Sequence, residues 1–240
     1  MMEEPEALEA RVNRPQQRSH QLSSGADGEK VQSKLETSPP SFFKHPGRLE
    51  AFSDGVFAIA ITLLALELRV PPVETASTPL RLWQALLEGW PSYFALLLSF
   101  GTIYAAWIGH HMMLQQVQDI RPALVWTNGL FLLSIVLLPF TTALVAEHLT
   151  HPGAPVAVAI YAGVNALTSL MYLRLYQVSQ RHFTEASPNL RLASLGAGVG
   201  LALCGGAVIL AFVTPIGALL LVACVWLWWS LPDAGRRAQR

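Results

Sequence analysis

Residues 48–68 form an apolar stretch, RLEAFSDGVFAIAITLLALEL, that is long enough to cross a lipid bilayer as a single helix. A membrane-spanning helix needs about 20 mainly apolar residues, and this stretch supplies them almost without interruption. Three polar or charged residues, Arg48, Ser53 and Asp54, stand near its start. Charges this close to hydrocarbon are expensive, so they are usually paired, and they often mark an ion or substrate path.

The composition separates a polar N-terminal segment from an apolar remainder. Over the whole chain 52% of residues are hydrophobic and 13% are charged, whereas soluble domains carry about 25% charged residues. Residues 1–44 contain five Lys or Arg before Lys44 and seven Asp or Glu. Such a segment buries too little apolar surface to offset its ordering entropy. We expect a disordered cytoplasmic tail over residues 1–44, a membrane domain over residues 45–232 and a basic cytoplasmic tail over residues 233–240.

Six stretches have the length and the apolar character of membrane spans. A short amphipathic piece, residues 80–88, precedes the second of them. We therefore expect an all-α, polytopic membrane protein with six transmembrane helices, surrounded by membrane lipid. The zero formal net charge gives no reason to expect nucleic acid as a partner. The six stretches cover residues 49–69, 90–116, 122–146, 155–178, 189–213 and 215–231.

An even number of spans places both termini on one side of the membrane. If that side is the cytoplasm, nine Lys or Arg residues flank the spans inside and two flank them outside. Cytoplasmic loops of membrane proteins carry the excess of positive charge. We expect a multi-pass protein of the cell membrane with both termini cytoplasmic. The inside residues are Lys44, Arg48, Arg121, Arg174, Arg181, Arg191, Arg236, Arg237 and Arg240, and the outside residues are Arg69 and Arg81.

One face of the first span carries a narrow stripe of residues. At about 100° per residue, the stripe contains Gly55, Ile59, Thr62, Leu66 and Arg69, with Leu63 beside it. Around a symmetry axis the apolar members would form rings able to gate by dewetting, and Thr62 would form a ring of hydroxyls. Periodicity by itself favours the alternative, because most such stripes are ordinary helix packing or face lipid.

The entrance of the first span carries the motif R-x-x-x-F-S-D, formed by Arg48, Phe52, Ser53 and Asp54. This motif resembles the signature of the endolysosomal potassium channel family (transmembrane protein 175) and its bacterial homologues. The resemblance implies a homotetramer whose first helices surround a pore for K⁺. The chain holds a single copy of the signature, as the bacterial homologues do, whereas animal members resemble two fused repeats.

The resemblance also assigns roles along the pore-lining stripe. It implies that Ile59 forms the narrowest ring, that Leu63 and Leu66 line the same pore, and that Thr62 contributes to ion selectivity. Arg69 lies on this stripe near the outer mouth, where a ring of cations would repel K⁺. We expect Arg69 to turn away, or to pair with Glu67 or Glu74 of a neighbouring chain.

A second group of polar residues lies in the second and third spans. The resemblance implies that Trp107, His110, His111 and Asn128 hold the signature network of Arg48, Phe52, Ser53 and Asp54 together. For the two histidines, structural hydrogen bonding and a role as a pH sensor or proton path both stay open, and the first is favoured. Asp54 is read as a buried structural carboxylate, and Ser53 is expected to bond back to the carbonyl of Leu49. No ligand spacing around the histidines predicts a metal site.

Three functions remain open from the sequence. A passive potassium channel is the first, and a secondary transporter of a small solute or ion is the second, for which the region of Pro139 would have to hold a break in the third span. The third is a structural membrane protein that conducts nothing. The chain contains no H-E-x-x-H, no G-x-S-x-G and no phosphate loop, so we expect neither an enzyme nor a cofactor.

Overall fold

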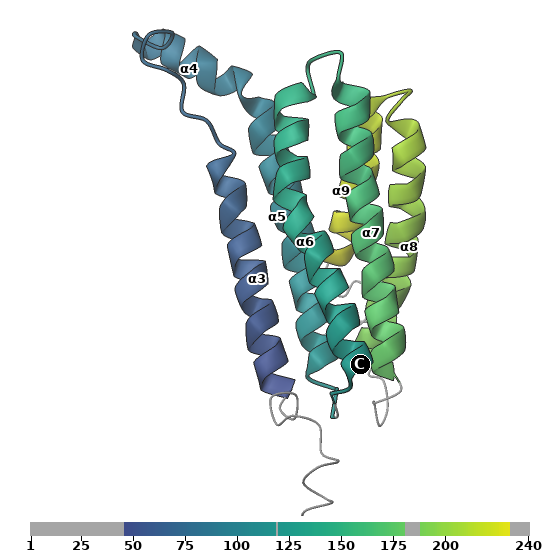
Figure 1. Ribbon diagram of the computed structural model, residues 1–240. Helices are drawn as coiled ribbons and strands as arrows, with labels where there is room; N and C mark the ends of the chain where they lie inside the picture. The colour runs from purple at the N-terminus through teal and green to yellow at the C-terminus, as the bar shows by residue number, and fades with distance from the viewer. Residues whose placement is uncertain (1–45, 119, 181–187, 231–240) are drawn as a thin grey trace, which may run out of the picture. The chain divides into compact units, whose positions relative to one another are not determined.

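A computed structural model describes residues 46–118, 120–180 and 188–230. These residues belong to one compact unit, residues 45–240. The tails predicted over residues 1–44 and 233–240 lie outside the described residues, as does Arg181. Seven α-helices make up the described part of the chain, which contains no β-strand (Figure 1). They are α3 (Pro46–Leu66), α4 (Pro79–Glu88), α5 (Trp90–Leu114), α6 (Pro122–His148), α7 (Ala154–Gln180), α8 (Pro188–Leu210) and α9 (Pro215–Ser230).

The all-α membrane architecture is confirmed. Five of the described helices, α3, α5, α6, α7 and α8, are long and apolar enough to cross a membrane, and α9 is a shorter apolar helix. These six helices coincide with the six predicted spans. The first helix ends at Leu66, three residues before the predicted limit, ahead of Pro71 and Pro72. The fifth ends at Leu210, likewise three residues early.

Prolines mark the starts of most helices. A proline fits the first helical turn because the N–H that it lacks would have no partner there. Pro79, Pro122, Pro188 and Pro215 are each the first residue of a helix. Pro139, by contrast, lies inside α6, and the helix runs through it without a break. The third span therefore holds no broken helix of the kind that a transporter site would use.

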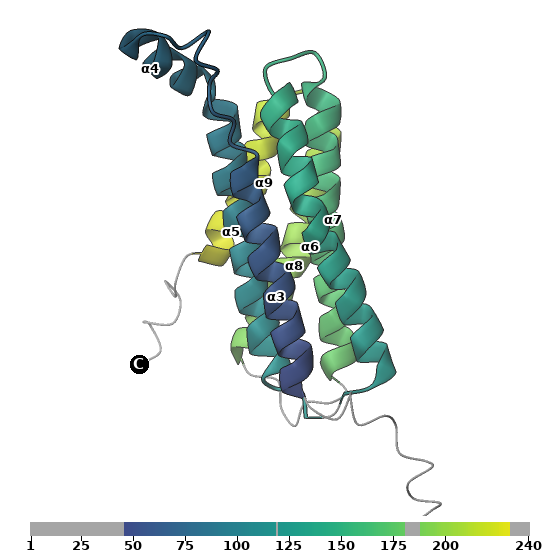
Figure 2. The ribbon, with the colours of Figure 1, turned by 60° about the vertical axis from the view of Figure 1, so that its left-hand side comes forward.

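The short helix α4 lies apart from the other helices. In both ribbon views it projects outward at the upper end of the bundle, from the start of α5 (Figures 1 and 2). It has no buried residue, and Leu80, Trp83 and Leu87 are exposed. Thr78 caps its N-terminus by accepting a hydrogen bond from the backbone N–H of Arg81. An amphipathic helix in this place is typical of a helix that lies at the membrane surface.

The core of the unit has two parts. The first contains Phe57 and Leu64 of α3, packed with buried residues such as Phe131 of α6 and Leu175 of α7. The second lies among α5, α6, α7, α8 and α9, around Tyr161. Among the described residues, α3 contributes buried side chains to the first part and none to the second. Consequently α3 is packed from one side, by α5 and α6.

Candidate functional site

Helix α3 has one buried face and one uncovered face. Ser53, Phe57, Ala60 and Leu64 recur every three or four residues and are almost fully buried, with exposed fractions of 2% or less. Only 22% of the apolar 18-residue segment of α3 is buried inside the unit, against 33–50% of the corresponding segments of the other four long spans. Of these five long spans, α3 is therefore the one that the rest of the unit covers least.

The residues predicted to line a pore lie on the uncovered face. Ile59 is 61% exposed, Leu63 39% and Leu66 75%. Thr62 is exposed as well, and its hydroxyl donates a hydrogen bond to the carbonyl of Ile59 (2.9 Å). The structure thus places all four residues, which sequence periodicity put on one face, away from the core of the single chain.

Ser53 and Asn128 connect α3 to α6 inside the first part of the core. The Ser53 hydroxyl donates to the carbonyl of Leu49 (2.8 Å), as expected from the sequence. Its oxygen accepts a hydrogen bond from Nδ2 of Asn128 (3.0 Å). Oδ1 of Asn128 lies 2.7 Å from Nε2 of His110 on α5. Because Oδ1 can only accept, this geometry assigns the ring proton of a neutral His110 to Nε2. Three helices are joined by one chain of buried hydrogen bonds.

Aromatic rings surround His110. Its ring is stacked on that of Phe131, with centroids 5.5 Å apart and an interplanar angle of 12°. The ring of Phe57 lies against it at 5.4 Å. His110 is fully buried, so its position favours the structural interpretation of this histidine over an exposed sensor.

Trp107 and His111 contact the acidic residues of α3. The indole Nε1 of Trp107 donates a hydrogen bond to Oδ1 of Asp54 (2.8 Å). Nδ1 of His111 lies 2.8 Å from Oε1 of Glu50. The indole ring stacks on the imidazole of His111, with centroids 5.6 Å apart. The two side chains of α5 therefore bind two successive carboxylates on one face of α3.

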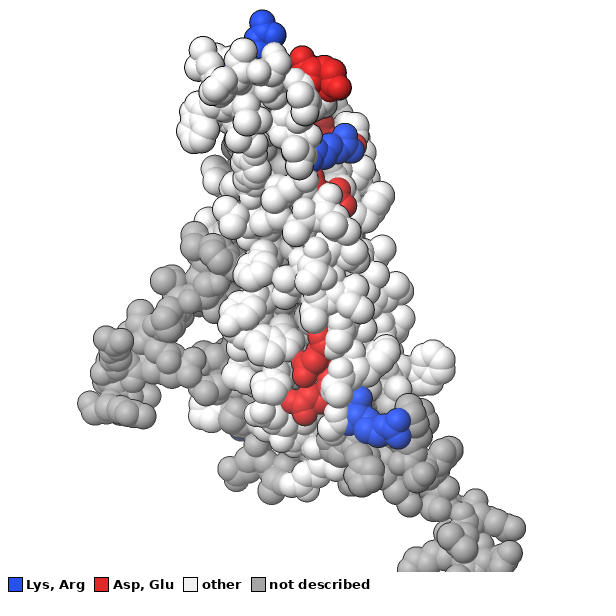
Figure 3. Space-filling view, turned by 90° about the vertical axis from the view of Figure 1, so that its left-hand side faces the viewer, with Lys and Arg blue, Asp and Glu red and all other residues white. Residues whose placement is uncertain are grey.

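Asp54 differs from the expectation of a buried carboxylate, and Phe52 is exposed. Asp54 is only partly buried, because it lies at the edge where α3 meets α5 rather than in the core. The Phe52 side chain is 63% exposed in the single chain. Arg48 lies exposed in the first turn of α3. The face of the unit that carries α3 has charged side chains toward its lower end and an uncharged stretch above them (Figure 3).

Arg69 forms an ion pair that the sequence did not predict. Its guanidinium contacts Oε1 of Glu147 at the end of α6, within the same chain, rather than Glu67 or Glu74. Together with Glu67, His148 and other residues, the pair lines a hollow of about 440 Å³. Arg69 is therefore directed toward α6 in the single chain.

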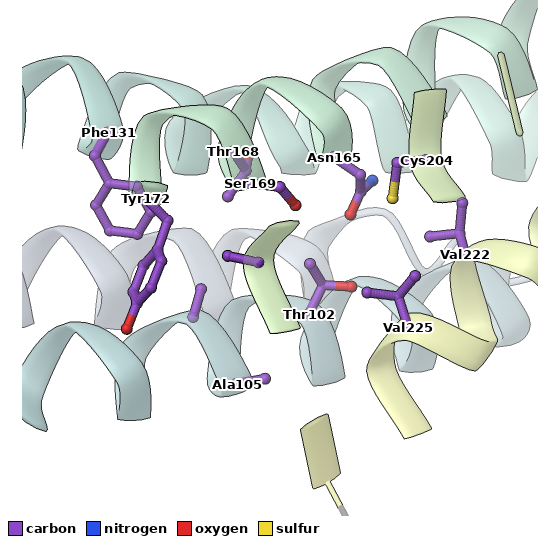
Figure 4. A pocket seen from close by; sticks show the side chains of 12 residues that line it. Thr102, Ala105, Phe131, Asn165, Thr168, Ser169, Tyr172, Cys204, Val222 and Val225 are labelled. Carbon is purple, nitrogen blue, oxygen red and sulfur yellow. The ribbon is translucent and has the colours of Figure 1, made fainter. Parts of the chain in front are cut away.

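A separate cavity lies inside the bundle. It has a volume of about 60 Å³ and lies among α5, α6, α7, α8 and α9. Thr102, Asn165, Ser169 and Cys204 surround it (Figure 4). No residue of the pore-lining stripe lines it, so it is distinct from the predicted pore.

Sequence reasoning missed Glu50, Gln115 and Glu147. Glu50 precedes Asp54 by four residues, and this spacing places two carboxylates on one helix face. That signal was present in the sequence, whereas the pairing of Glu50 with His111 was not. Gln115 lies one turn beyond His111. The Nε2 atom of Gln115 lies 2.8 Å from the Nε2 atom of His111.

The comparisons with known proteins agree with the architecture. Residues 48–139 match the family model described as the endosomal/lysosomal potassium channel TMEM175. The fold matches the crystal structure of a homologue, from Chamaesiphon minutus, of the lysosomal potassium-selective channel TMEM175. The TM-score is 0.69 and the identity 36%, and the match covers 77% of this chain and 95% of that one. The chain belongs to the TMEM175 family.

Curated relatives of this TMEM175-family chain include bacterial and animal proteins. A potassium channel of Chamaesiphon minutus is 47% identical over 131 residues, which are 55% of this chain and 64% of the relative. A potassium channel of Streptomyces collinus is 44% identical, over 54% of this chain and 62% of the relative. The chicken endosomal/lysosomal proton channel TMEM175 is 37% identical, over 42% of this chain and 21% of the relative.

The matched stretch spans somewhat less than two thirds of the length of the two bacterial relatives. The family and these named relatives are ion channels rather than enzymes. Family membership and the long apolar helices together make this a membrane protein.

Proposed function

We propose that this chain assembles into a homotetrameric channel through which K⁺ moves passively. The first helix of each chain, α3, would line a central pore, with Ile59 as an apolar constriction and Leu63 and Leu66 as further apolar rings. Thr62 would supply a ring of hydroxyls. Two relatives are named as potassium channels, and this supports K⁺ as the permeant ion.

The observation that carries the proposal is the division of α3 into two faces. Its buried face packs on α5 and α6, while the face bearing Ile59 and Leu66 is left uncovered by the chain. A helix held from one side, at the edge of its unit, is suitably placed to meet copies of itself. Apolar rings formed by such copies can close a pore by excluding water from it.

Ionisable side chains at the same edge support an assembly of several chains. Glu50, Asp54 and His111 are only partly buried, and they lie within helices that cross the membrane. Exposure of such groups to lipid is expensive, so they face protein or water in most membrane proteins. Neighbouring chains around an aqueous pore would provide both surroundings.

We further propose that the cytoplasm lies at the end of the unit where α3 begins. The ends of α3, α6 and α8 on that side carry Arg48, Arg121 and Arg191. At the opposite end of the unit, the basic residues beside the described spans are Arg69 and Arg81. The distribution of positive charge supports cytoplasmic termini and a location in a bacterial cell membrane.

Ion flux into liposomes that contain the purified protein tests the pore assignment. We expect K⁺ flux in the wild type, and an altered, increased flux in the Ile59→Asn variant, because a polar ring would hydrate the constriction. Ile209→Asn is the matched control, since Ile209 is 75% exposed on α8, a helix that does not pack on α3. Its flux is expected to equal that of the wild type.

Three other results would contradict parts of the proposal. Unchanged flux in Ile59→Asn would remove Ile59 from the pore. Saturable K⁺ uptake coupled at fixed stoichiometry to a second solute would identify a transporter. A verified tetramer without any flux would identify a structural protein, and native mass spectrometry in detergent gives the number of chains.

The hydroxyl ring has its own test. Thr62→Val preserves the shape of the side chain and removes the hydroxyl, so we expect the preference for K⁺ over Na⁺ to fall while flux continues. Thr127→Val is the control, because the Thr127 hydroxyl bonds to the carbonyl of Ala123 on α6. Unchanged ion preference in Thr62→Val would exclude the hydroxyl ring from selectivity.

A further inference from the structure

Two acidic side chains of α3 and one imidazole of α5 come together at the lower edge of the bundle. One ligand atom from each of Glu50, Asp54 and His111 lies within 4.8 Å of the other two. All three residues are partly buried in the single chain. We infer that Glu50, Asp54 and His111 form a binding site for a divalent transition-metal ion, with Zn²⁺ as the best fit.

The donor set suits such an ion. Two carboxylates and one neutral imidazole bring a charge of −2 and a mixture of oxygen and nitrogen ligands. Imidazole favours Zn²⁺ and its transition-metal neighbours, whereas Mg²⁺ and Ca²⁺ prefer oxygen alone. Three protein ligands with a fourth position for water is a common arrangement for Zn²⁺.

The distances require only small side-chain movements. Ligand atoms about 2.1 Å from a tetrahedral Zn²⁺ lie about 3.4 Å from one another. The atoms of this group lie within 4.8 Å of one another, and one pair in it, Oε1 of Glu50 and Nδ1 of His111, is separated by 2.8 Å. Rotation of the carboxylates about their side-chain bonds is sufficient, because the backbones already present all three groups to one point.

Neighbouring residues already orient the ligands. Trp107 donates a hydrogen bond to Oδ1 of Asp54 and leaves Oδ2 to bind the ion. Its indole stacks on the His111 ring and limits how that ring can turn. Nε2 of His111 is held by the side-chain amide of Gln115, whose oxygen can accept the Nε2 proton once Nδ1 binds metal. Partners of this kind tune metal affinity in known sites.

The spacing on α3 gives an electrostatic reason for a cation. Glu50 and Asp54 lie four residues apart on one helix face, and like charges at this spacing destabilise a helix. A divalent ion would remove that repulsion and attach α3 to α5 directly. Metal binding is independent of ion flux, so the inference can hold or fail regardless of the function proposed above.

Calorimetric titration of the metal-free, untagged oligomer with ZnCl₂ tests the inference. We expect one Zn²⁺ per chain and far weaker binding of Mg²⁺. Glu50→Gln and His111→Gln are each expected to lower Zn²⁺ affinity by about tenfold or more, and Trp107→Phe by about tenfold. Glu74→Gln and His151→Ala are matched controls, since both residues are exposed at the other end of the unit, and they are expected to bind as the wild type does.

Absorption spectroscopy of the wild type tests the ligand set without any variant. X-ray absorption of the Zn²⁺-loaded protein is expected to show nitrogen and oxygen neighbours, including imidazole, and no sulfur. Absence of Zn²⁺ binding to the wild type would overturn the inference. Wild-type affinity in both Glu50→Gln and His111→Gln would also overturn it, as would a sulfur neighbour, which would place the ion on a cysteine.

Discussion

The side-chain amide of Asn128 donates a hydrogen bond to the hydroxyl of Ser53, 75 residues earlier in the chain. This bond is buried, and it continues through the Asn128 oxygen to His110. It attaches the helix proposed to line the pore to the two helices behind it. The position of α3 therefore depends on an amide that contacts neither the uncovered face nor the solvent.

Replacement of Asn128 by Ala is expected to destabilise the protein. The change leaves the Ser53 oxygen and Nε2 of His110 without their buried partner, and an unsatisfied buried polar group costs about 1–3 kcal/mol. Thermal unfolding in detergent measures the effect. Thr127→Ala is the control, since its hydroxyl bonds only within α6, and it is expected to change the free energy of unfolding by less than about 0.5 kcal/mol. Equal stability of the two variants would contradict the role of the network.

Trp107→Phe separates the hydrogen bond of Trp107 from its packing. The phenyl ring still stacks beside Tyr104 and His111, but the N–H that donates to Asp54 is lost. Hydrogen bonds to charged groups contribute about 1.5–3 kcal/mol, and partial exposure of Asp54 favours the lower end of that range. Thermal unfolding is compared with that of Trp126→Phe, whose side chain is 77% exposed. A variant as stable as this control would show that the bond contributes nothing.

Gly109→Ala is expected to disturb the packing of α5 on α7. A Cβ at this position would lie 2.8 Å from the hydroxyl oxygen and 3.2 Å from two ring carbons of Tyr172, which is buried. Overpacking of a core costs about 1–3 kcal/mol. Gly129→Ala is the matched control, because a Cβ there meets nothing within 4 Å. It is expected to leave stability unchanged or to raise it, since Ala favours helix over Gly by about 1 kcal/mol. The opposite order of the two melting temperatures would refute this assignment.

Arg69→Gln is expected to have little effect on channel conductance. The guanidinium of Arg69 is paired with Glu147 on α6, so it is not available to form a ring of charge in the pore. The pair is exposed, and such pairs contribute about 0–1 kcal/mol to stability. Single-channel recording compares this variant with Arg81→Gln on α4. A clear rise in conductance for Arg69→Gln alone would place that charge at the pore mouth.

Most of the helical architecture follows from the sequence for a direct physical reason. A span must supply about 20 apolar residues whatever it packs against, so hydropathy locates it without knowledge of its neighbours. The six predicted spans correspond to α3 and α5–α9, and the limits differ by a few residues where a loop replaces the last turn, as after Leu66. The arrangement of Ile59, Thr62 and Leu66 on one face likewise follows from helical geometry.

The sequence also located the polar residues of the site but not all of their partners. The family resemblance drew attention to Asp54, Trp107, His110 and Asn128, and the structure joins these residues through hydrogen bonds between helices. Glu50 went unnoticed, because it lies inside the signature at a position that the motif leaves unspecified. Whether the uncovered face of α3 lines a pore stays a prediction.

The tertiary structure alone decided which side chains meet across helices. The pairing of Glu50 with His111, and of Arg69 with Glu147, depends on how each helix is rotated about its axis and on how far it is shifted along its neighbour. Local sequence fixes neither quantity, since both result from the packing of whole faces such as that of Phe57 against Phe131. Periodicity determines the face on which a residue lies, whereas packing determines what that face touches.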